Sequence, residues 1–348
     1  MNATSNVETL YWAQDALFLI DQRRLPHELQ YVRCVTVAEV RNAIESMVVR
    51  GAPAIGIAAA YGVVLAVEAA YKRDPQNWAN VVRADLAELK SARPTAVNLA
   101  WAIEEMTSHF EHVDNPPHQA LLAQAHTMRE QDIDANKVMG ELGAQFIAEN
   151  STVVTHCNAG ALATAGYGTA LGVIRSARQH KNLRRVFAGE TRPWFQGARL
   201  TAWELQRDNI PVTLIADSAI AHLMSSRTID CVITGADRVA ANGDVANKIG
   251  TYSLAVCARA HGVRFMVVAP TSTIDMGTAH GSQIPIEERA GDELLVYQGS
   301  RISPADLDAY NPVFDITPAE YVDVLVTERG VVEKPNLDTI EGLFSRKI

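Results

Sequence analysis

The pattern of hydrophobic and polar residues divides the chain near residue 150. Before that point, apolar residues recur at intervals of three and four from Val40 to Val48, and helical patterns continue from 55 to 150. This spacing predicts a mainly helical first part. Two short apolar segments, 10–12 and 16–20, flank a polar group and predict a β-hairpin ahead of the helices.

After residue 150, short β-branched runs alternate with helical patterns, which is typical of βαβ units and a parallel sheet. We therefore expect an α/β protein with a Rossmann-like parallel sheet in its C-terminal domain, 149–348. The smaller, mainly helical N-terminal domain, 1–148, carries the β-hairpin. The predicted strands are 152–154, 185–187, 212–215, 231–234 and 264–268.

Composition narrows the class of protein. The chain has 348 residues, 48% of them hydrophobic, which is enough for a sizeable core. A net charge of −9 argues against a nucleic-acid partner, which needs clustered Lys and Arg. The N-terminus lacks a basic region followed by an apolar core, and no apolar run approaches the roughly 18 residues of a membrane span. We expect a cytoplasmic protein without a membrane partner.

The four cysteines lie far apart, without a CxxC motif or regular histidine spacing. This arrangement favours free thiols over a disulfide framework or a zinc site. We expect neither a metal nor an organic cofactor. The cysteines are Cys34, Cys157, Cys231 and Cys257.

Two reactive side chains follow predicted strands. Cys157 comes just after 152–154, and Asp237 follows 231–234 through Gly235-Ala236. The carboxyl ends of parallel strands share one sheet edge, where ligands bind, so we expect the two residues near one another. Cys157 is either a reactive thiol ahead of a helix start or a small buried hydrophobe. Asp237 is either a general acid with a raised pKa, or a helix or turn cap, or the ion-pair partner of Arg238.

Candidate anion-binding groups lie at breaks between helical patterns. Arg50-Gly51-Ala52 and Arg93-Pro94-Thr95 place arginines there, although an exposed arginine is more often only solvated. Asn247-Lys248 is expected to begin the helix after Asp237, on the same sheet edge. Together these groups would suit an anionic ligand rich in hydroxyls.

Seven motifs, taken in order, resemble the methylthioribose-1-phosphate isomerase family from about Leu10 to Val332. This family is related to ribose-1,5-bisphosphate isomerase and to regulatory subunits of the eukaryotic translation-initiation exchange factor. The motifs are Arg50-Gly-Ala-Pro-Ala-Ile-Gly56, Thr155-His-Cys-Asn-Ala-Gly160, Glu190-Thr-Arg-Pro193, Gln196-Gly-Ala-Arg-Leu-Thr-Ala-Trp-Glu-Leu205, Thr234-Gly-Ala-Asp-Arg238, Asn247-Lys-Ile-Gly-Thr251 and Asn311-Pro-Val-Phe-Asp315.

The resemblance implies conversion of 5-methylthioribose 1-phosphate to 5-methylthioribulose 1-phosphate in methionine salvage. It also implies that Cys157 and Asp237 are the catalytic pair. We expect a small-molecule sugar phosphate as partner and a homodimer as the assembly. The residues that the resemblance assigns to sugar-phosphate binding are Arg50, Gly51, Ala52, Arg93, Gln196, Asn247 and Lys248.

Other functions stay open. Gly189-Glu190 and Trp194-Phe195 depart from the acidic and aliphatic residues expected around Thr191-Arg192-Pro193, which leaves 5-deoxyribose 1-phosphate as an alternative substrate. Ribose 1,5-bisphosphate would need a second cluster of cations. A non-catalytic regulator or phosphometabolite sensor on the same scaffold has no need of the thiol and acid pair, so the presence of both favours an enzyme.

Overall fold

The computed structural model describes residues 8–93 and 97–345, and its chain forms two compact units. Unit 1 contains Met1–Val138 and Ala159–Gly172, and unit 2 contains Met139–Asn158 and Val173–Ile348. The expected boundary between residues 148 and 149 therefore differs from the division by contacts in two ways. The chain leaves unit 1 ten residues earlier, and it returns there directly after Asn158.

The sheet of unit 1 contains the predicted hairpin. Strand β1 (Leu10–Ala13) pairs antiparallel with β2 (Ala16–Ile20), and β2 pairs with β3 (Tyr31–Cys34), which the sequence pattern missed. The two turn residues, Gln14 and Asp15, have φ of 51° and 52°. Positive φ at both positions is the geometry of a two-residue hairpin turn that suits the strand twist.

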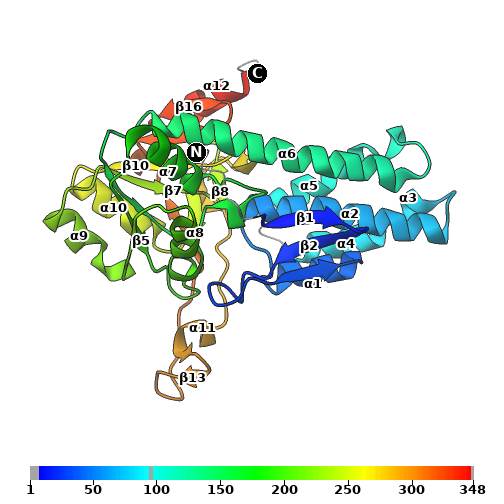
Figure 1. Ribbon diagram of the computed structural model, residues 1–348, viewed down its shortest axis with the longest axis horizontal. Coiled ribbons are helices and arrows are strands. Elements are labelled where there is room, and N and C mark those ends of the chain that lie inside the picture. The colour runs from blue at the N-terminus through cyan, green and yellow to red at the C-terminus, as the bar shows by residue number, and fades with distance from the viewer. Residues whose placement is uncertain (1–7, 94–96, 346–348) are drawn as a thin grey trace. The chain divides into compact units, whose positions relative to one another are not determined.

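The rest of unit 1 is largely helical, as predicted (Figure 1). Helix α1 begins with a capping box between Thr36 and Glu39, which satisfies backbone N–H groups that its first turn leaves open. Helix α2 packs against α1, α3, α4 and α5. The helices are α1 (Val37–Glu45), α2 (Ala52–Arg73), α3 (Trp78–Val81), α4 (Arg83–Ser91), α5 (Val97–Ser108) and the first part of α6 (Pro117–Ala144), which continues into unit 2 from Met139, with short 3₁₀ turns at Phe110–His112 and Ala161–Ala163.

Helix α2 corrects the expectation that no apolar run reaches the length of a membrane span. By length and composition its 22 residues could cross a membrane, with a mean hydropathy of 1.7 over the most apolar window. However, 83% of that window is buried inside the structure. Alanine and glycine fill much of the helix and let neighbouring helices approach closely, so α2 has the burial of a core helix.

Unit 2 is built on a seven-stranded sheet in the order β16-β15-β10-β7-β4-β5-β6. All five predicted strands are present and pair in parallel, which gives a mixed α/β fold. Strand β15 extends the parallel part, and β16 closes that edge antiparallel. The strands are β4 (Thr152–Thr155), β5 (Arg185–Gly189), β6 (Val212–Ile215), β7 (Cys231–Thr234), β10 (Arg264–Val268), β15 (Val324–Thr327) and β16 (Gly330–Glu333).

A second sheet of unit 2 has the order β11-β8-β9-β14, and a two-stranded ribbon joins β12 to β13. The strands are β8 (Arg238–Ala240), β9 (Val245–Lys248), β11 (Ile274–Asp275), β12 (Val296–Tyr297), β13 (Ser300–Arg301) and β14 (Phe314–Thr317). The helices of this part of the chain are α7 (Ala170–Lys181), α8 (Ala202–Arg207), α9 (Ile220–Ser226), α10 (Thr251–Ala260), α11 (Asp292–Leu295) and α12 (Leu337–Ser345).

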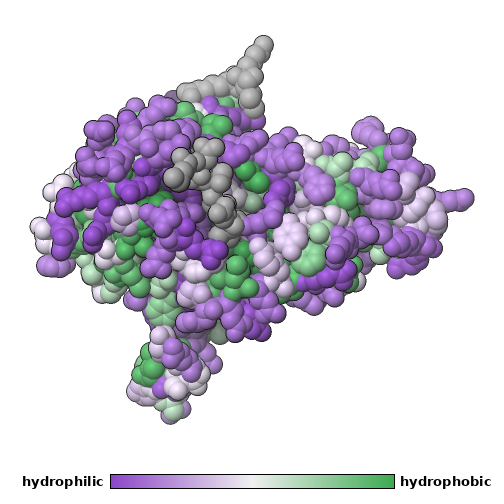
Figure 2. Space-filling model, viewed as in Figure 1, coloured by the Kyte–Doolittle hydropathy of each residue, from purple (hydrophilic) through white to green (hydrophobic). Residues whose placement is uncertain are grey.

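The segment with α11, β12 and β13 stands away from the large sheet of unit 2 (Figure 1). Exposed apolar side chains lie on it and in the residues that follow β13, among them Tyr297, Ile302 and Tyr310. Figure 2 shows hydrophobic residues on this segment, whereas most of the visible face is hydrophilic.

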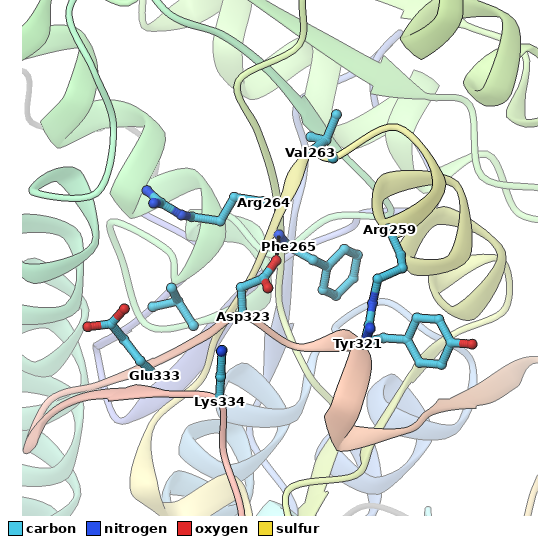
Figure 3. Close-up of a pocket in the computed structure, with 10 residues that line it drawn as sticks. Arg259, Val263, Arg264, Phe265, Tyr321, Asp323, Glu333 and Lys334 are labelled. Carbon is cyan, nitrogen blue, oxygen red and sulfur yellow. Dashed lines mark hydrogen bonds between the residues drawn. The ribbon is translucent and has the colours of Figure 1, made fainter.

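A cavity of about 350 Å³ lies at the amino end of β10. Figure 3 shows Arg264 and Glu333 on one side of it, and Arg259 with Tyr321 on the other. Ligands of parallel sheets bind at the opposite, carboxyl edge. None of the candidate site residues lines this cavity, so we place the functional site elsewhere.

Candidate functional site

Cys157 follows β4 in a constrained backbone conformation. Its φ is 57°, which is uncommon for a residue with a side chain, and the residue is 9% exposed. Its N–H donates to Thr191 Oγ1 at 2.9 Å, and its carbonyl accepts from Thr201 Oγ1 at 2.5 Å. A residue keeps this unfavourable left-handed conformation only when surrounding contacts hold it there, and such residues cluster at functional sites.

The loop after β5 supplies one of these contacts. Thr191 is also left-handed, with a φ of 63°, and its Oγ1 donates to the carbonyl of Gly189 at 3.1 Å. Asp217, after β6, accepts from the N–H groups of Thr191 and Arg192 at 2.9 and 2.8 Å. Asp217 therefore anchors this loop to the end of β6.

Gly197 allows the loop to fold back on its own strand. A Cβ atom there would lie 1.7 Å from the carbonyl oxygen of Gly189. Any other residue would therefore push the loop away from β5. The close approach fixes Gln196, the preceding residue, over the same strand end.

Gln196 is one of the predicted binding residues, and its Oε1 atom is unusual. The residue is 5% exposed, and within the described residues Oε1 has no hydrogen-bond partner. A buried polar atom without a partner needs an explanation, for which a bound ligand is one candidate.

Asp237 lies at the same edge of the sheet as Cys157. Strand β4 pairs directly with β7, with Thr155 opposite Ile233. Cys157 comes two residues after Thr155, and Asp237 comes four residues after Ile233. Asp237 is half-buried, and its N–H donates to the carbonyl of Ala246 at 2.9 Å.

Asn247 and Lys248 end a strand, so the expectation that they begin a helix was wrong. They belong to β9, which pairs with β8 and β14, and α10 starts only at Thr251. Asn247 Nδ2 donates to Thr251 Oγ1 at 3.0 Å. Lys248 Nζ donates to the carbonyl of Val313 at 2.7 Å and lies 4.3 Å from the centre of the Phe314 ring.

Arg50, Gly51, Ala52 and Arg93 belong to unit 1. Gly51 has a φ of 95°, and a Cβ there would lie 2.6 Å from atoms of Ala163. Ala52 opens α2, and Arg50 Nε donates to Gln22 Oε1 at 3.1 Å. Arg93 follows α4 and is half-buried. Pro94 and Thr95 lie outside the described residues, and the binding role of the other four residues stays a prediction.

His156 is a buried neighbour of Cys157 that sequence reasoning did not single out as a site residue. It is 5% exposed, and its Nε2 donates to the carbonyl of Ile249 at 2.8 Å. Burial lowers the pKa of His156, although Asp217 lies 3.9 Å from Nδ1 and opposes this. A neutral imidazole here holds the end of β9 against the Cys157 turn. Its position directly before Cys157 was the available signal.

Asp315 caps α10 at this end of the sheet. Its carboxylate accepts from the N–H groups of Gly250 and Tyr252, at 2.7 and 3.1 Å. Burial raises the pKa of Asp315 to about 6, despite these hydrogen bonds and the charge of Lys248.

This shift predicts a pH dependence of stability. A carboxyl whose pKa is higher in the folded than in the unfolded protein binds more protons when folded, so stability falls as pH rises from about 4 to 6. We expect the free energy of unfolding of wild type to fall by about 1–3 kcal/mol over this window relative to Asp315→Asn. Urea unfolding from pH 4 to 7 measures the difference. Asp338→Asn, an exposed residue of α12, is the control, and parallel profiles of wild type and Asp315→Asn would contradict the prediction.

Among the described residues, no group of three or more His, Cys, Asp or Glu side chains could hold a metal ion. In unit 2 a thiol, a carboxyl and a buried amide follow strands at one edge of the large sheet, and a buried cation ends β9 of the second sheet. This set can move protons and bind hydroxyl or phosphate oxygens without a redox group.

Comparison with known proteins identifies the family. Residues 48–334 match the model of the Initiation factor 2 subunit family. A methylthioribose-1-phosphate isomerase from Alkalilimnicola ehrlichii is 58% identical over 95% of this chain and 96% of its own.

Two solved structures are also similar. One is 5-methylthioribose 1-phosphate isomerase from Pyrococcus horikoshii OT3, with a TM-score of 0.91 and 42% identity over 99% of this chain and 97% of its own. The other is described as translation initiation factor eIF-2B, subunit delta, from A. fulgidus, with a TM-score of 0.85 and 41% identity over 97% and 100%. The chain belongs to the Initiation factor 2 subunit family and, within it, to the methylthioribose-1-phosphate isomerases.

Proposed function

We propose that this protein is an aldose–ketose isomerase that converts 5-methylthioribose 1-phosphate to 5-methylthioribulose 1-phosphate in methionine salvage. The names of its relatives support this activity. The observation that carries it is that a thiol held in a left-handed turn and a carboxyl follow two neighbouring parallel strands. A regulator would have no use for this pair.

The substrate dictates an acid-assisted route. Phosphate on the anomeric oxygen prevents a free aldehyde, so the bond between C1 and the ring oxygen must break first. Asp237 in its protonated form donates a proton to that ring oxygen. Hydrogen then moves from C2 to C1, and the C2 hydroxyl returns a proton to the Asp237 carboxylate as the ketone forms. Atoms and charge balance, because substrate and product are isomers.

Cys157 would assist the transfer from C2 to C1 in one of two ways. As a proton carrier it takes the C2 hydrogen as a proton, which gives a cis-enediol phosphate, and returns a proton to C1. Alternatively, hydride moves directly from C2 to C1 and the thiol only polarises the site. In D₂O the first route incorporates solvent deuterium at C1, and the second does not.

The direct test incubates the purified protein with three sugar phosphates and follows ketose formation. These are 5-methylthioribose 1-phosphate, 5-deoxyribose 1-phosphate and ribose 1,5-bisphosphate. We expect turnover of the first. Preference for one of the other two sugar phosphates would identify that compound as the substrate. Binding without turnover of any of the three would favour a non-catalytic regulator.

We further propose a homodimeric, cytoplasmic enzyme without nucleic-acid or membrane partners, in which a Rossmann-like catalytic domain follows a smaller helical domain. Light scattering at micromolar concentration tests the assembly. A monomer at all concentrations would contradict it.

Arg93 is proposed to bind the substrate phosphate through charge-assisted hydrogen bonds. Arg93→Ala is then expected to weaken kcat/KM by about 1.5–3 kcal/mol, the scale of a hydrogen bond to a charged group. Arg73→Ala removes an exposed arginine at the end of α2 and should leave kcat/KM unchanged. If both variants behave alike, Arg93 has no part in binding.

Turnover is expected to continue after dialysis against a strong chelator, because the proposed acid and thiol chemistry requires no metal. The measurement compares kcat before and after dialysis, and again after each of several divalent ions is added. If dialysis abolishes activity and one divalent ion restores it, the mechanism requires a metal.

A further inference from the structure

A buried ionic cluster of Arg175, Glu204 and Asp208 is linked by hydrogen bonds to the turn at Cys157. The side chains of Arg175 on α7 and Glu204 on α8 are fully buried, and Arg175 Nη2 lies 2.9 Å from Glu204 Oε2. Asp208, at the end of α8, lies 2.6 Å from the same nitrogen. A buried ion pair costs desolvation and is therefore weak evidence for stability. Its position suggests a second role.

The cluster connects to Cys157 through two side chains. Glu204 Oε1 accepts from Asn158 Nδ2 at 2.9 Å, and the same nitrogen donates to Thr201 Oγ1 at 3.2 Å. The Thr201 hydroxyl in turn donates to the carbonyl of Cys157. Both hydrogens of the Asn158 amide are used, and Thr201 accepts one bond while it donates another. Each hydrogen bond in this chain of contacts joins a donor to an acceptor.

The backbone around Thr201 is also irregular. Thr201 ends a π-helical turn, Gly197–Thr201, that precedes α8. Single π turns occur frequently at functional sites. The turn begins directly after Gln196, so one local structure carries both the predicted binding amide and the hydroxyl that holds Cys157.

We propose that Glu204, fixed by Arg175, is a positioning residue that acts through Asn158 and Thr201 to hold Cys157 in its left-handed conformation. Thr191 fixes the N–H of Cys157, and Thr201 fixes its carbonyl. With both peptide groups held, the direction of the Cα–Cβ bond is set by the protein and not by the substrate. This proposal rests on the catalytic role proposed for Cys157.

The test compares Thr201→Val, which keeps the side-chain shape and removes the hydroxyl, with Thr201→Ser, which keeps the hydroxyl. Displacement of a reacting group by about 1 Å can cost up to roughly 100-fold in rate. We expect Thr201→Val to lower kcat by about 10-fold to 100-fold with KM within about threefold of wild type. Thr201→Ser should restore kcat to within about threefold.

The matched control is Thr317→Val, the same substitution at another fully buried threonine. Within the described residues Thr317 Oγ1 has no hydrogen-bond partner, and the residue lies in β14. Its kcat should equal that of wild type. A role of Thr201 in stability alone would shift the melting temperature and leave kcat of the folded protein unchanged.

A second readout does not depend on catalysis. Peptide-resolved mass spectrometry gives the rate at which iodoacetamide alkylates Cys157 at pH 7. We expect Thr201→Val to change this rate by more than about threefold, and Thr201→Ser and Thr317→Val to leave it unchanged.

If Thr201→Val fails to fold, Asn158→Leu removes both amide donors at similar volume and is measured instead. When both variants fold, the double variant should have the same kcat as the less active of the two single variants, because both substitutions break one chain of contacts.

The outcomes separate the two proposals. If folded Thr201→Val keeps both wild-type kcat and the wild-type alkylation rate, the positioning role is overturned. If Cys157→Ser keeps wild-type kcat, the catalytic role is overturned instead, and the alkylation rate still decides whether Thr201 positions the thiol.

Discussion

Cys157→Ser and Asp237→Asn are each expected to lower kcat by about two orders of magnitude or more while the protein melts and binds substrate much as wild type does. Serine is a weaker acid than cysteine, and asparagine cannot donate a carboxyl proton to the ring oxygen. Both substitutions nearly preserve side-chain volume, so the packing at this sheet edge changes little. The measurements are melting temperature, substrate affinity and kcat on the same preparations.

The alternative roles of these residues predict a different result. If Cys157 is core filler and Asp237 a turn cap, the substitutions act through stability, typically by about 0.5–3 kcal/mol, and the folded variants stay active. Cys231→Ser is the matched control, because Cys231 lies inside β7 and is almost fully buried. Normal melting, normal binding and wild-type turnover in both variants would remove the proposed mechanism and favour the regulator.

Arg175→Met is expected to lower the free energy of unfolding by about 3–5 kcal/mol. The substitution leaves Glu204 buried without its cation, together with Asp208. A buried charge that loses its partner incurs the full desolvation cost, whereas methionine replaces only the apolar part of arginine. Burial already raises the pKa of Asp208, and removal of the arginine would raise it further.

Equilibrium unfolding in urea measures this change. Arg185→Met serves as control, since Arg185 is exposed and its side chain bonds only to Thr213 among the described residues. It should shift the free energy of unfolding by no more than about 0.5 kcal/mol. Equal effects of the two substitutions would show that the buried arginine contributes no more to the free energy of unfolding than a surface arginine does.

Local sequence determined five strands of the large sheet and the edge at which the reactive residues lie, whereas β15 and β16 were not predicted. Runs such as Cys231–Thr234 are β-branched, apolar and bounded by glycine or polar residues, and these features are sufficient for a buried parallel strand. Because parallel strands end at a common edge, Cys157 and Asp237 could be assigned to the same edge without the structure. The hairpin was equally local, since its turn lies between two apolar segments.

Only tertiary contacts decided the second sheet and the division of the chain. Val245–Lys248 contains two polar residues, and by itself it favours the start of a helix; antiparallel pairing with Phe314–Thr317 makes it a strand. The return of Ala159–Gly172 to unit 1 likewise depends on contacts distant in sequence, such as the approach of Gly51 to Ala163.

The conformation of Cys157 likewise depends on tertiary contacts and could not be predicted from local sequence. Its left-handed backbone is held by Thr191 and Thr201, which lie 34 and 44 residues further along the chain. Sequence therefore determined which groups the site contains, because strand ends and residue types are local properties. Tertiary structure determined how those groups are oriented, because the hydrogen bonds that fix them join segments that meet only in the folded protein.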